Sequence, residues 1–239
     1  MTMLSDEAVN SLSSFSRYFK PDEIEYLIEH RIPNKFYKMM WIHTVGKGRI
    51  SKLEFYRLSA EYCFASARFQ AITRRQRVHF IKLAIGRSVL DYGGGSGDLS
   101  IMLAGGGFDV YYVDIDGVTS DFADFRFRKL DLPIKCRPFS GDLVSHFEKL
   151  PIFDDIFSID VIEHLDEAEQ FDLLRCFKRH LCSKGRLFLT GPSKGTPYIF
   201  DEKGRVLGHP EHRGINFDIN KHLLKQGFRR LRRSVWEKI

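Results

Sequence analysis

The sequence of 239 residues has few cysteines and no long apolar run. Its four cysteines are Cys63, Cys136, Cys176 and Cys182. They form no C-x-x-C pair and lie within apolar stretches, which argues against a disulfide framework or a zinc site and favours a reducing compartment. No apolar run is long enough to span a membrane, and the first residues lack the basic and apolar regions of a signal peptide. We therefore expect a cytoplasmic protein with no membrane partner.

The sequence also lacks internal repeats, low-complexity segments and a strong excess of one charge. Lysine and arginine number 37 against 31 aspartates and glutamates, a net charge of +6 that falls short of a dedicated nucleic-acid binder. Four arginines surround Leu231 near the end of the chain: Arg229, Arg230, Arg232 and Arg233. Their alternation predicts a charged outer face of a strand, so nucleic acid is not an expected partner.

Two parts of the chain differ in pattern. Residues 1–84 show helical spacing and almost no strand signal, and Ser51 with Glu54 has the capping-box spacing that predicts a helix start. An apolar pattern continues from there through Phe64. We expect residues 1–84 to form a helical cap that covers a substrate, and residues 85–239 to form a second domain.

The second part alternates short apolar runs with helical stretches. The runs lie at 88–90, 110–113, 134–139, 156–159 and 187–189. Continuous apolar strands separated by helices predict a Rossmann-like α/β fold, with a mostly parallel sheet covered on both faces. Pro138 favours an edge position for the third strand. Only one later strand is evident, at 228–236, so either residues 198–208 supply a seventh or the sheet has six.

A glycine-rich turn follows the first predicted strand, in the run V-L-D-Y-G-G-G-S-G-D that ends at Asp98. Glycines at such a turn let the backbone approach a ligand at the carboxyl end of the strand. Asp98 stands where a dinucleotide fingerprint needs glycine or alanine, and no Gly-Lys-Ser/Thr follows as in a Walker loop. Asp114 ends the second strand, where a carboxylate can accept both hydroxyls of a ribose. A nucleoside-like ligand is therefore expected.

These segments, together with those at 139–143, 153–165 and 185–190, resemble the class I S-adenosylmethionine-dependent methyltransferases. The resemblance implies S-adenosylmethionine as cofactor and S-adenosylhomocysteine as product. It implies that Asp91 and Gly93 hold the methionine end and that Asp114 binds the ribose. The cofactor-binding residues implied are Asp91, Gly93, Gly95, Gly97, Asp114, Ile115, Asp142, Leu143 and Asp160.

Catalytic candidates follow the fourth strand and the fifth. His164 is predicted to act as general base, because imidazole titrates near neutral pH, with Glu163 beside it. His212, with His209 as an alternative, lies in a loop where this family often contacts substrate. The spacing of Asp160, Glu163 and His164 also resembles the metal pattern of polyprenyl-benzoquinol O-methyltransferases, but the first acid there is glutamate. No residue is therefore assigned as a metal ligand, and use of a divalent metal stays open as an alternative to the general base. A purely structural role for the Glu-His pair stays open.

The predicted reaction is methyl transfer to an oxygen, nitrogen or carbon atom of a small-molecule acceptor. Aromatic residues of the cap, including Trp41, Phe55 and Tyr56, would wall a pocket for an apolar or aromatic acceptor. Two alternatives stay open: methylation of RNA or protein, and a non-catalytic subunit that binds the cofactor. A homodimer is compatible with the sequence.

Overall fold

Seven strands of the computed structural model form one sheet in the order β3-β2-β1-β4-β5-β7-β6. The structure describes residues 41, 44–59, 62–63, 66–67, 70, 74–191 and 217–239. The strands are β1 Ser88–Tyr92, β2 Asp109–Val113, β3 Lys135–Cys136, β4 Phe153–Ile159, β5 Leu181–Thr190, β6 Phe228–Arg232 and β7 Val235–Lys238. The strands β1 to β5 are parallel, whereas β7 is antiparallel to both β5 and β6. The predicted Rossmann-like α/β fold is confirmed.

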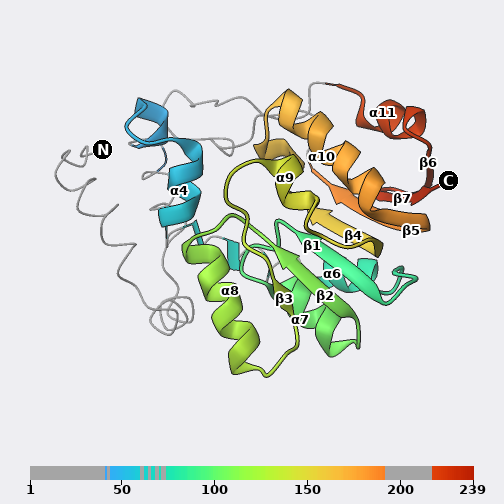
Figure 1. Cartoon of the computed structure of the whole chain (residues 1–239), viewed down its shortest axis with the longest axis horizontal. Helices are drawn as coiled ribbons and strands as arrows, with labels where there is room; N and C mark the ends of the chain where they lie inside the picture. The colour runs from blue at the N-terminus through green and yellow to red at the C-terminus, as the bar shows by residue number, and fades with distance from the viewer. Residues whose placement is uncertain are drawn as a thin grey trace.

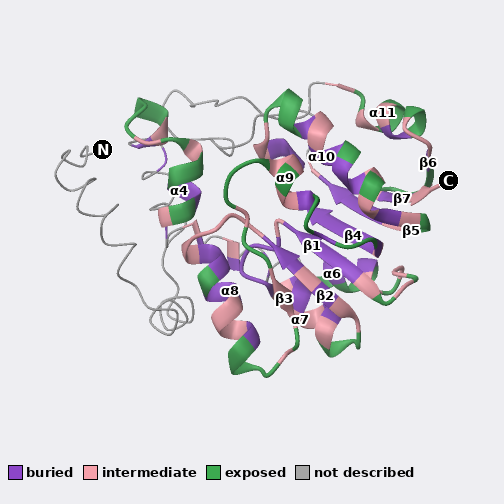
Figure 2. Ribbon diagram, viewed as in Figure 1, coloured by how far each residue is buried: buried purple, intermediate pink, exposed green. Residues whose placement is uncertain are grey.

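Helices cover both faces of the sheet (Figure 1). One face carries α6 Arg74–Ile81, α7 Asp98–Gly105 and α8 Val118–Lys129. The other face carries α9 Leu143–Phe147, α10 Glu167–His180 and α11 Ile219–Lys225. The central strands are buried on both sides, as their colouring in Figure 2 shows. This double burial explains why these strands read as continuous apolar runs in the sequence.

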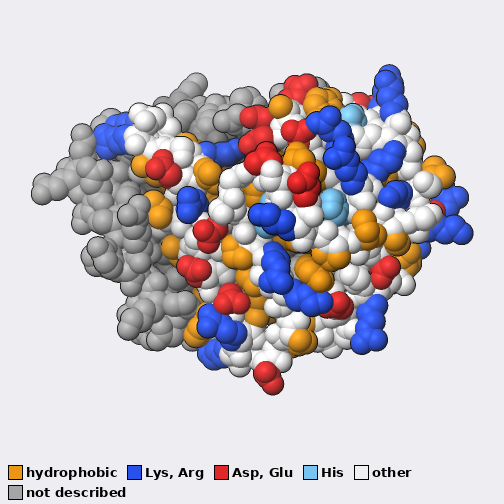
Figure 3. Space-filling model, in the orientation of Figure 1, with side chains coloured by type: hydrophobic (Ala, Val, Ile, Leu, Met, Phe, Trp, Pro, Cys, Tyr) orange, Lys and Arg blue, Asp and Glu red, His pale blue; other side chains and the backbone are white. Residues whose placement is uncertain are grey.

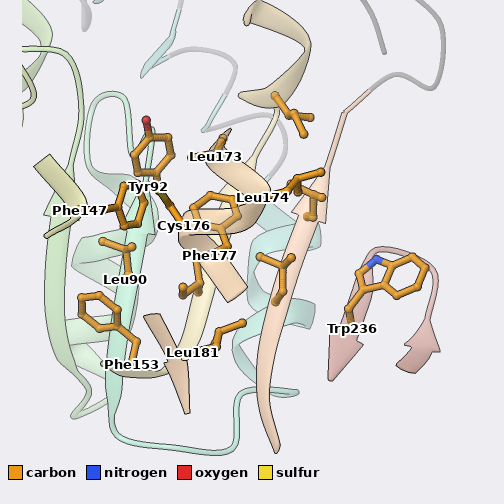
Figure 4. Close-up of a cluster of buried hydrophobic side chains, with 14 of the residues drawn as sticks. Leu90, Tyr92, Phe147, Phe153, Leu173, Leu174, Cys176, Phe177, Leu181 and Trp236 are labelled. Carbon is orange, nitrogen blue, oxygen red and sulfur yellow. The ribbon is translucent and has the colours of Figure 1, made fainter. Parts of the chain in front are cut away.

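The two apolar cores lie on opposite sides of β1. Leu90 packs into the core under α9 and α10, which Figure 4 shows with Tyr92, Phe147 and Phe177 pointing toward one another. Val89, the preceding residue, packs into the core under α6 and α7. Successive side chains of a strand point to opposite faces, so a single strand anchors both helical layers.

The C-terminal strand differs from the prediction. The run expected as one strand at 228–236 folds as the hairpin of β6 and β7, with Arg233 and Ser234 between them. Ser234 has a φ of 65°, which reverses the chain in a two-residue turn. The seventh strand therefore comes from this same segment, and residues 198–208 lie outside the described part of the chain. The expected edge position of Pro138 is consistent with β3 as the outermost strand.

Ahead of the sheet, α4 Lys52–Leu58 begins as predicted. Ser51 accepts a hydrogen bond from the Glu54 backbone and the Glu54 side chain accepts one in return, which forms the capping box. The helix ends at Leu58, earlier than the apolar pattern through Phe64 predicts, because Ser59 adopts an extended conformation. A short 3-10 helix, η1 Val45–Lys47, precedes it and ends at Gly48 with a φ of 68°.

The proposed division near residue 84 stays a prediction. The helix α6 lies on the N-terminal side of that division, yet its Phe80 packs with Val89 and Phe188 in the core of the sheet. In the part of the chain that the structure describes, no helix combines the length and the apolar character that crossing a membrane requires.

Candidate active site

A cavity of about 330 Å³ lies at the carboxyl ends of β1, β2 and β4, with α4 on its other side. Predicted site residues that line it are Gly93, Asp114, Ile115, Asp142, Leu143, Asp160 and His164. From the N-terminal part of the chain, Lys52, Leu53, Tyr56 and Tyr62 also line it. The topology thus brings together side chains that are far apart in the sequence.

The glycine loop has a conformation that side chains would obstruct. Gly93 has a φ of +71°, and a Cβ atom there would lie 2.3 Å from Val161 Cγ2. Gly95 has a φ of +56°, and its Cβ would lie 2.4 Å from Gln70 Nε2. Gly97 precedes the first residue of α7. Gly93 lines the cavity, whereas Gly95 and Gly97 shape the loop behind it.

Asp114 follows β2 and reaches the cavity beside the loop. Its Oδ2 accepts a hydrogen bond from the Gly95 backbone at 2.6 Å, and its Oδ1 accepts one from the Ile115 backbone at 2.7 Å. Burial raises the pKa of Asp114 to about 6, and the two backbone hydrogen bonds oppose this rise because they favour the ionised form. The carboxylate is therefore fixed in place and only weakly favoured in its charged state.

Asp91 lies beneath the loop and does not line the cavity. Its side chain is 2% exposed and accepts a hydrogen bond from Ser100 Oγ at 2.7 Å. Burial raises the pKa of Asp91 to about 6, opposed by the Ser100 hydrogen bond and by the positive charge of Arg77. This placement links β1 to α7, so a contact with the methionine end of a cofactor stays a prediction.

Apolar walls and one acid form the part of the cavity near β3. Ile115, Leu143 and Phe139 line it. Asp142 caps α9 by accepting a hydrogen bond from the Ser145 backbone at 2.7 Å, and this bond holds its pKa below the usual range. Phe139 was not among the predicted site residues, because its apolar side chain gives no sign in the sequence that it faces a cavity.

His164 lies at the opposite wall, in the 3-10 helix η2 Ile162–His164. Its Nδ1 is 3.0 Å from the Tyr56 hydroxyl, and the Lys52 ammonium donates a hydrogen bond to its backbone oxygen. Tyr56 is 5% exposed and packs against Trp41 and Phe55. The N-terminal part of the chain therefore holds His164 through both its ring and its backbone.

Asp160 directly follows β4 and has a φ of 58°, which is uncommon for a residue other than glycine. Thr190 Oγ1 donates a hydrogen bond to its Oδ1 at 2.8 Å and accepts one from its backbone nitrogen at 3.0 Å. This pair of bonds joins the carboxyl ends of β4 and β5 and holds the acid at the cavity wall.

The structure separates Glu163 from the cavity. Its side chain is fully buried, and a Cβ at Gly191 would lie 2.9 Å from its Oε2. Among the described residues, no group of three or more histidine, cysteine or acidic side chains is arranged to hold a metal ion. His209 and His212 lie outside the described residues, so their predicted roles stay predictions.

Gln70 is a site residue that the sequence did not reveal. Its side chain is 6% exposed; Nε2 donates to the Gly94 carbonyl at 2.9 Å, and Oε1 accepts from the Asp98 backbone at 3.1 Å. Ser96 Oγ also donates to Oε1, at 3.2 Å. A lone glutamine in a helical stretch carries no motif, so only the tertiary structure shows that it supports the glycine loop.

The start of α7 carries its own counter-charges. Asp98, its first residue, lies 3.0 Å from Arg126, and Arg126 also donates to the Ser96 carbonyl at 2.6 Å. Anions bind at helix N-termini through the backbone amides and the helix dipole. Here a carboxylate of the protein occupies that position, which disfavours a pyrophosphate cofactor.

Comparison with known proteins decides the family. A family model described as a methyltransferase domain matches residues 60–230. The chain belongs to this methyltransferase family. The match confirms the predicted resemblance, and a comparison with the curated proteins finds no significant match.

Solved structures share the fold of this methyltransferase domain. Haemonchus contortus phosphoethanolamine N-methyltransferase 2, solved in complex with S-adenosyl-L-methionine, has a TM-score of 0.59 at 20% identity, over 76% of this chain and 45% of its own. TehB from Haemophilus influenzae has a TM-score of 0.52 at 18% identity, and the match covers 70% of this chain and 56% of TehB. The chain thus spans about half the length of these proteins, and the likeness establishes the fold.

Proposed function

We propose that this methyltransferase uses S-adenosylmethionine and acts on a small-molecule acceptor. The observation that carries the proposal is the position of Asp114, whose carboxylate reaches the cavity beside the glycine loop and below α4. An acid at the end of the second strand of such a sheet accepts the hydroxyls of a ribose.

The residues present fit such a cofactor. The cavity volume of about 330 Å³ lies within the usual range of ligand sites, about 300–1,000 Å³. Ile115 and Leu143 offer apolar surface for an adenine ring, and Asp142 offers an acceptor for its amino group. The Asp98–Arg126 pair leaves no site for a pyrophosphate at the start of α7.

When bound, S-adenosylmethionine supplies a methyl group already activated by the sulfonium sulfur. The protein therefore needs mainly to orient the acceptor and exclude water, effects worth several kcal/mol of the barrier. Gly93, Asp160 and His164 line the same cavity and would border the transferred group. His164 would take the proton of a protonated acceptor, with its ring oriented by the Tyr56 hydroxyl.

A small acceptor agrees with the charge distribution on the face of the molecule that Figure 3 shows. Figure 3 shows acidic and basic side chains interspersed over the visible face, with an acidic group near the start of α10. Polymeric nucleic acid is instead bound by clustered lysine and arginine. The catalytic roles predicted for Glu163 and His212, the homodimer and the cytoplasmic location stay predictions.

Calorimetry with S-adenosylhomocysteine, NAD and ATP tests the cofactor. We expect only the first to bind, and tighter binding of NAD would contradict the proposal. Incubation with methyl-labelled S-adenosylmethionine and fractionated cell extract then tests the acceptor. Label in small molecules supports the proposal, label in RNA or protein favours the macromolecular alternative, and cofactor binding without any transfer favours a non-catalytic subunit.

A further inference from the structure

A second cavity of about 620 Å³ lies next to the first, at the carboxyl end of β5. Its lining comes from α6, from the ends of β4 and β5, and from the turn of the β6–β7 hairpin. The polar side chains in this lining are Gln76, His79, Asp160, Thr190, Arg232, Arg233 and Ser234. Asp160 lines both cavities, so the two share this residue as a common part of their walls.

The four arginines of the hairpin fall into two pairs. Arg229 lies 2.6 Å from Glu237, and the guanidinium of Arg230 lies over the Trp236 ring at 5.6 Å from its centre. By contrast, the side chains of Arg232 and Arg233 have no ion pair or hydrogen bond with any residue in the described ranges. The predicted charged outer face of a strand therefore describes Arg229 and Arg230, whereas Arg232 and Arg233 line a cavity.

The backbone that carries these two arginines is held in a defined place. The Leu189 backbone donates a hydrogen bond to the Ser234 carbonyl at 3.0 Å, which ties the turn to the carboxyl end of β5. Figure 4 shows the turn of this hairpin at the same end of the sheet as the arrowhead of β5. A rigid backbone reduces the entropy lost when the side chains bind a ligand.

Two consecutive arginines that line one cavity and have no counter-ion among the described residues favour an oxyanion, since the planar fork of arginine matches carboxylate and phosphate. We propose that the second cavity binds the acceptor of the methyltransferase, and that this acceptor is a small molecule with a carboxylate or phosphate held by Arg232 and Arg233. The inference rests on the proposed function. It places the reacting end of the acceptor toward Asp160, which borders the cofactor cavity.

A small anion fits these observations better than a nucleic-acid strand. A strand needs several basic contacts along its backbone. On this hairpin the neighbouring arginines are already engaged by Glu237 and Trp236, so the basic surface does not continue from the cavity along β6.

The test compares wild type, Arg232→Gln/Arg233→Gln and the matched control Arg229→Gln/Arg230→Gln. Each protein is first titrated with S-adenosylhomocysteine, and equal affinity is expected in all three, which shows that they fold. Each loaded protein is then titrated with inorganic phosphate and with succinate, which separate phosphate from carboxylate recognition. We expect binding of at least one anion by wild type and control, and about tenfold or greater weakening in the first variant.

Methyl transfer provides the second measurement. The small-molecule fraction of an extract is divided on an anion-exchange resin, and labelled product is expected among the retained compounds, with about tenfold or greater loss of transfer only in Arg232→Gln/Arg233→Gln. Label confined to unretained compounds or to RNA would overturn the inference, as would equal losses in both variants. Failure of the wild type to bind S-adenosylhomocysteine would instead contradict the proposed function.

Discussion

Asp114 and Asp116 lie two residues apart after β2, yet their surroundings differ. Asp114 accepts two backbone hydrogen bonds in the cavity, whereas Asp116 is 46% exposed and lies 3.7 Å from Arg57 at the surface. Exposed ion pairs of this kind contribute little to the stability of a protein, so loss of the Asp116 charge should have little effect. Replacing Asp114 by Asn should weaken S-adenosylhomocysteine binding at least about tenfold, because it removes a charged contact to the ribose. Calorimetry on Asp116→Asn gives the matched control, which should bind like wild type.

The raised pKa of Asp114 also predicts how binding depends on pH. The pKa of about 6 means that the free protein protonates this carboxyl as the pH falls below 6. A ribose needs the ionised form as acceptor, so affinity for S-adenosylhomocysteine should fall about tenfold between pH 7 and pH 5. Titrations across this range should show a flat profile in Asp114→Asn. A wild-type affinity that does not change over the same range would remove Asp114 from the ribose site.

Substitutions of His164 and Tyr56 should affect catalysis without affecting cofactor binding. If His164 is the base, His164→Ala should lower kcat by about 10²–10⁴-fold while S-adenosylhomocysteine affinity stays near normal. Tyr56→Phe keeps the ring but removes the hydroxyl that lies 3.0 Å from Nδ1, so a smaller loss of kcat is expected. Steady-state rates and calorimetry on both variants measure this. Wild-type turnover in His164→Ala would transfer the role of base to His209 or His212.

At the scale of elements, local chemistry predicts where segments begin, and tertiary structure decides what they contact. The capping box at Ser51 and the apolar runs of the parallel strands are visible in the sequence because they depend on neighbours in the chain. The burial of Arg77, on an otherwise exposed stretch of α6, depends on Asp91 in β1 and cannot be inferred from helical spacing. The β6–β7 hairpin could likewise not be predicted from the sequence, because its two-residue turn contains neither glycine nor proline.

Gln70 tests the link between the N-terminal part of the chain and the glycine loop. Gln70→Ala removes the hydrogen bonds that the side chain makes to the Gly94 carbonyl, which keeps the Gly97 amide as a partner, and to the Asp98 amide; the loss is worth about 1–3 kcal/mol of unfolding free energy. Because the loop also positions Gly93 at the cavity, S-adenosylhomocysteine should bind more weakly as well. Urea denaturation and calorimetry measure the two effects. Gln76→Ala, at an exposed position of α6, is the control and should change neither.

At the scale of the whole molecule, the order of the strands explains why the site could be anticipated in part. Parallel strands bring their carboxyl ends to one edge, so Gly93, Asp114 and Asp160 meet there whatever their separation in sequence. The opposite wall comes from α4, and the second cavity comes from a hairpin whose place beside β5 follows from antiparallel pairing. No comparable rule predicts from sequence where α4 and the hairpin lie relative to the sheet. Tyr56 was therefore expected only to form part of an aromatic wall, and Arg232 only to lie on the charged surface of a strand.

The stability of the whole molecule should depend on pH through Asp91. Its pKa is about 6 in the folded protein, against 3.8 for an unperturbed aspartate, so the folded state binds more protons than the unfolded state between these values. The unfolding free energy that this group contributes is fully present below about pH 4 and is lost as the pH rises through 6. A difference of about two pKa units corresponds to roughly 3 kcal/mol.

Asp91→Asn isolates this contribution, since the amide oxygen can still accept the Ser100 hydrogen bond but does not titrate. The unfolding free energy of wild type minus that of the variant should therefore decrease by about 2–3 kcal/mol between pH 4 and pH 7. Urea denaturation of both proteins without ligand, at half-unit steps of pH, measures it, and titrations common to both proteins cancel in the difference. A difference that rises with pH would mean that Asp91 is stabilised in its ionised form, with the charge of Arg77 outweighing the cost of burial.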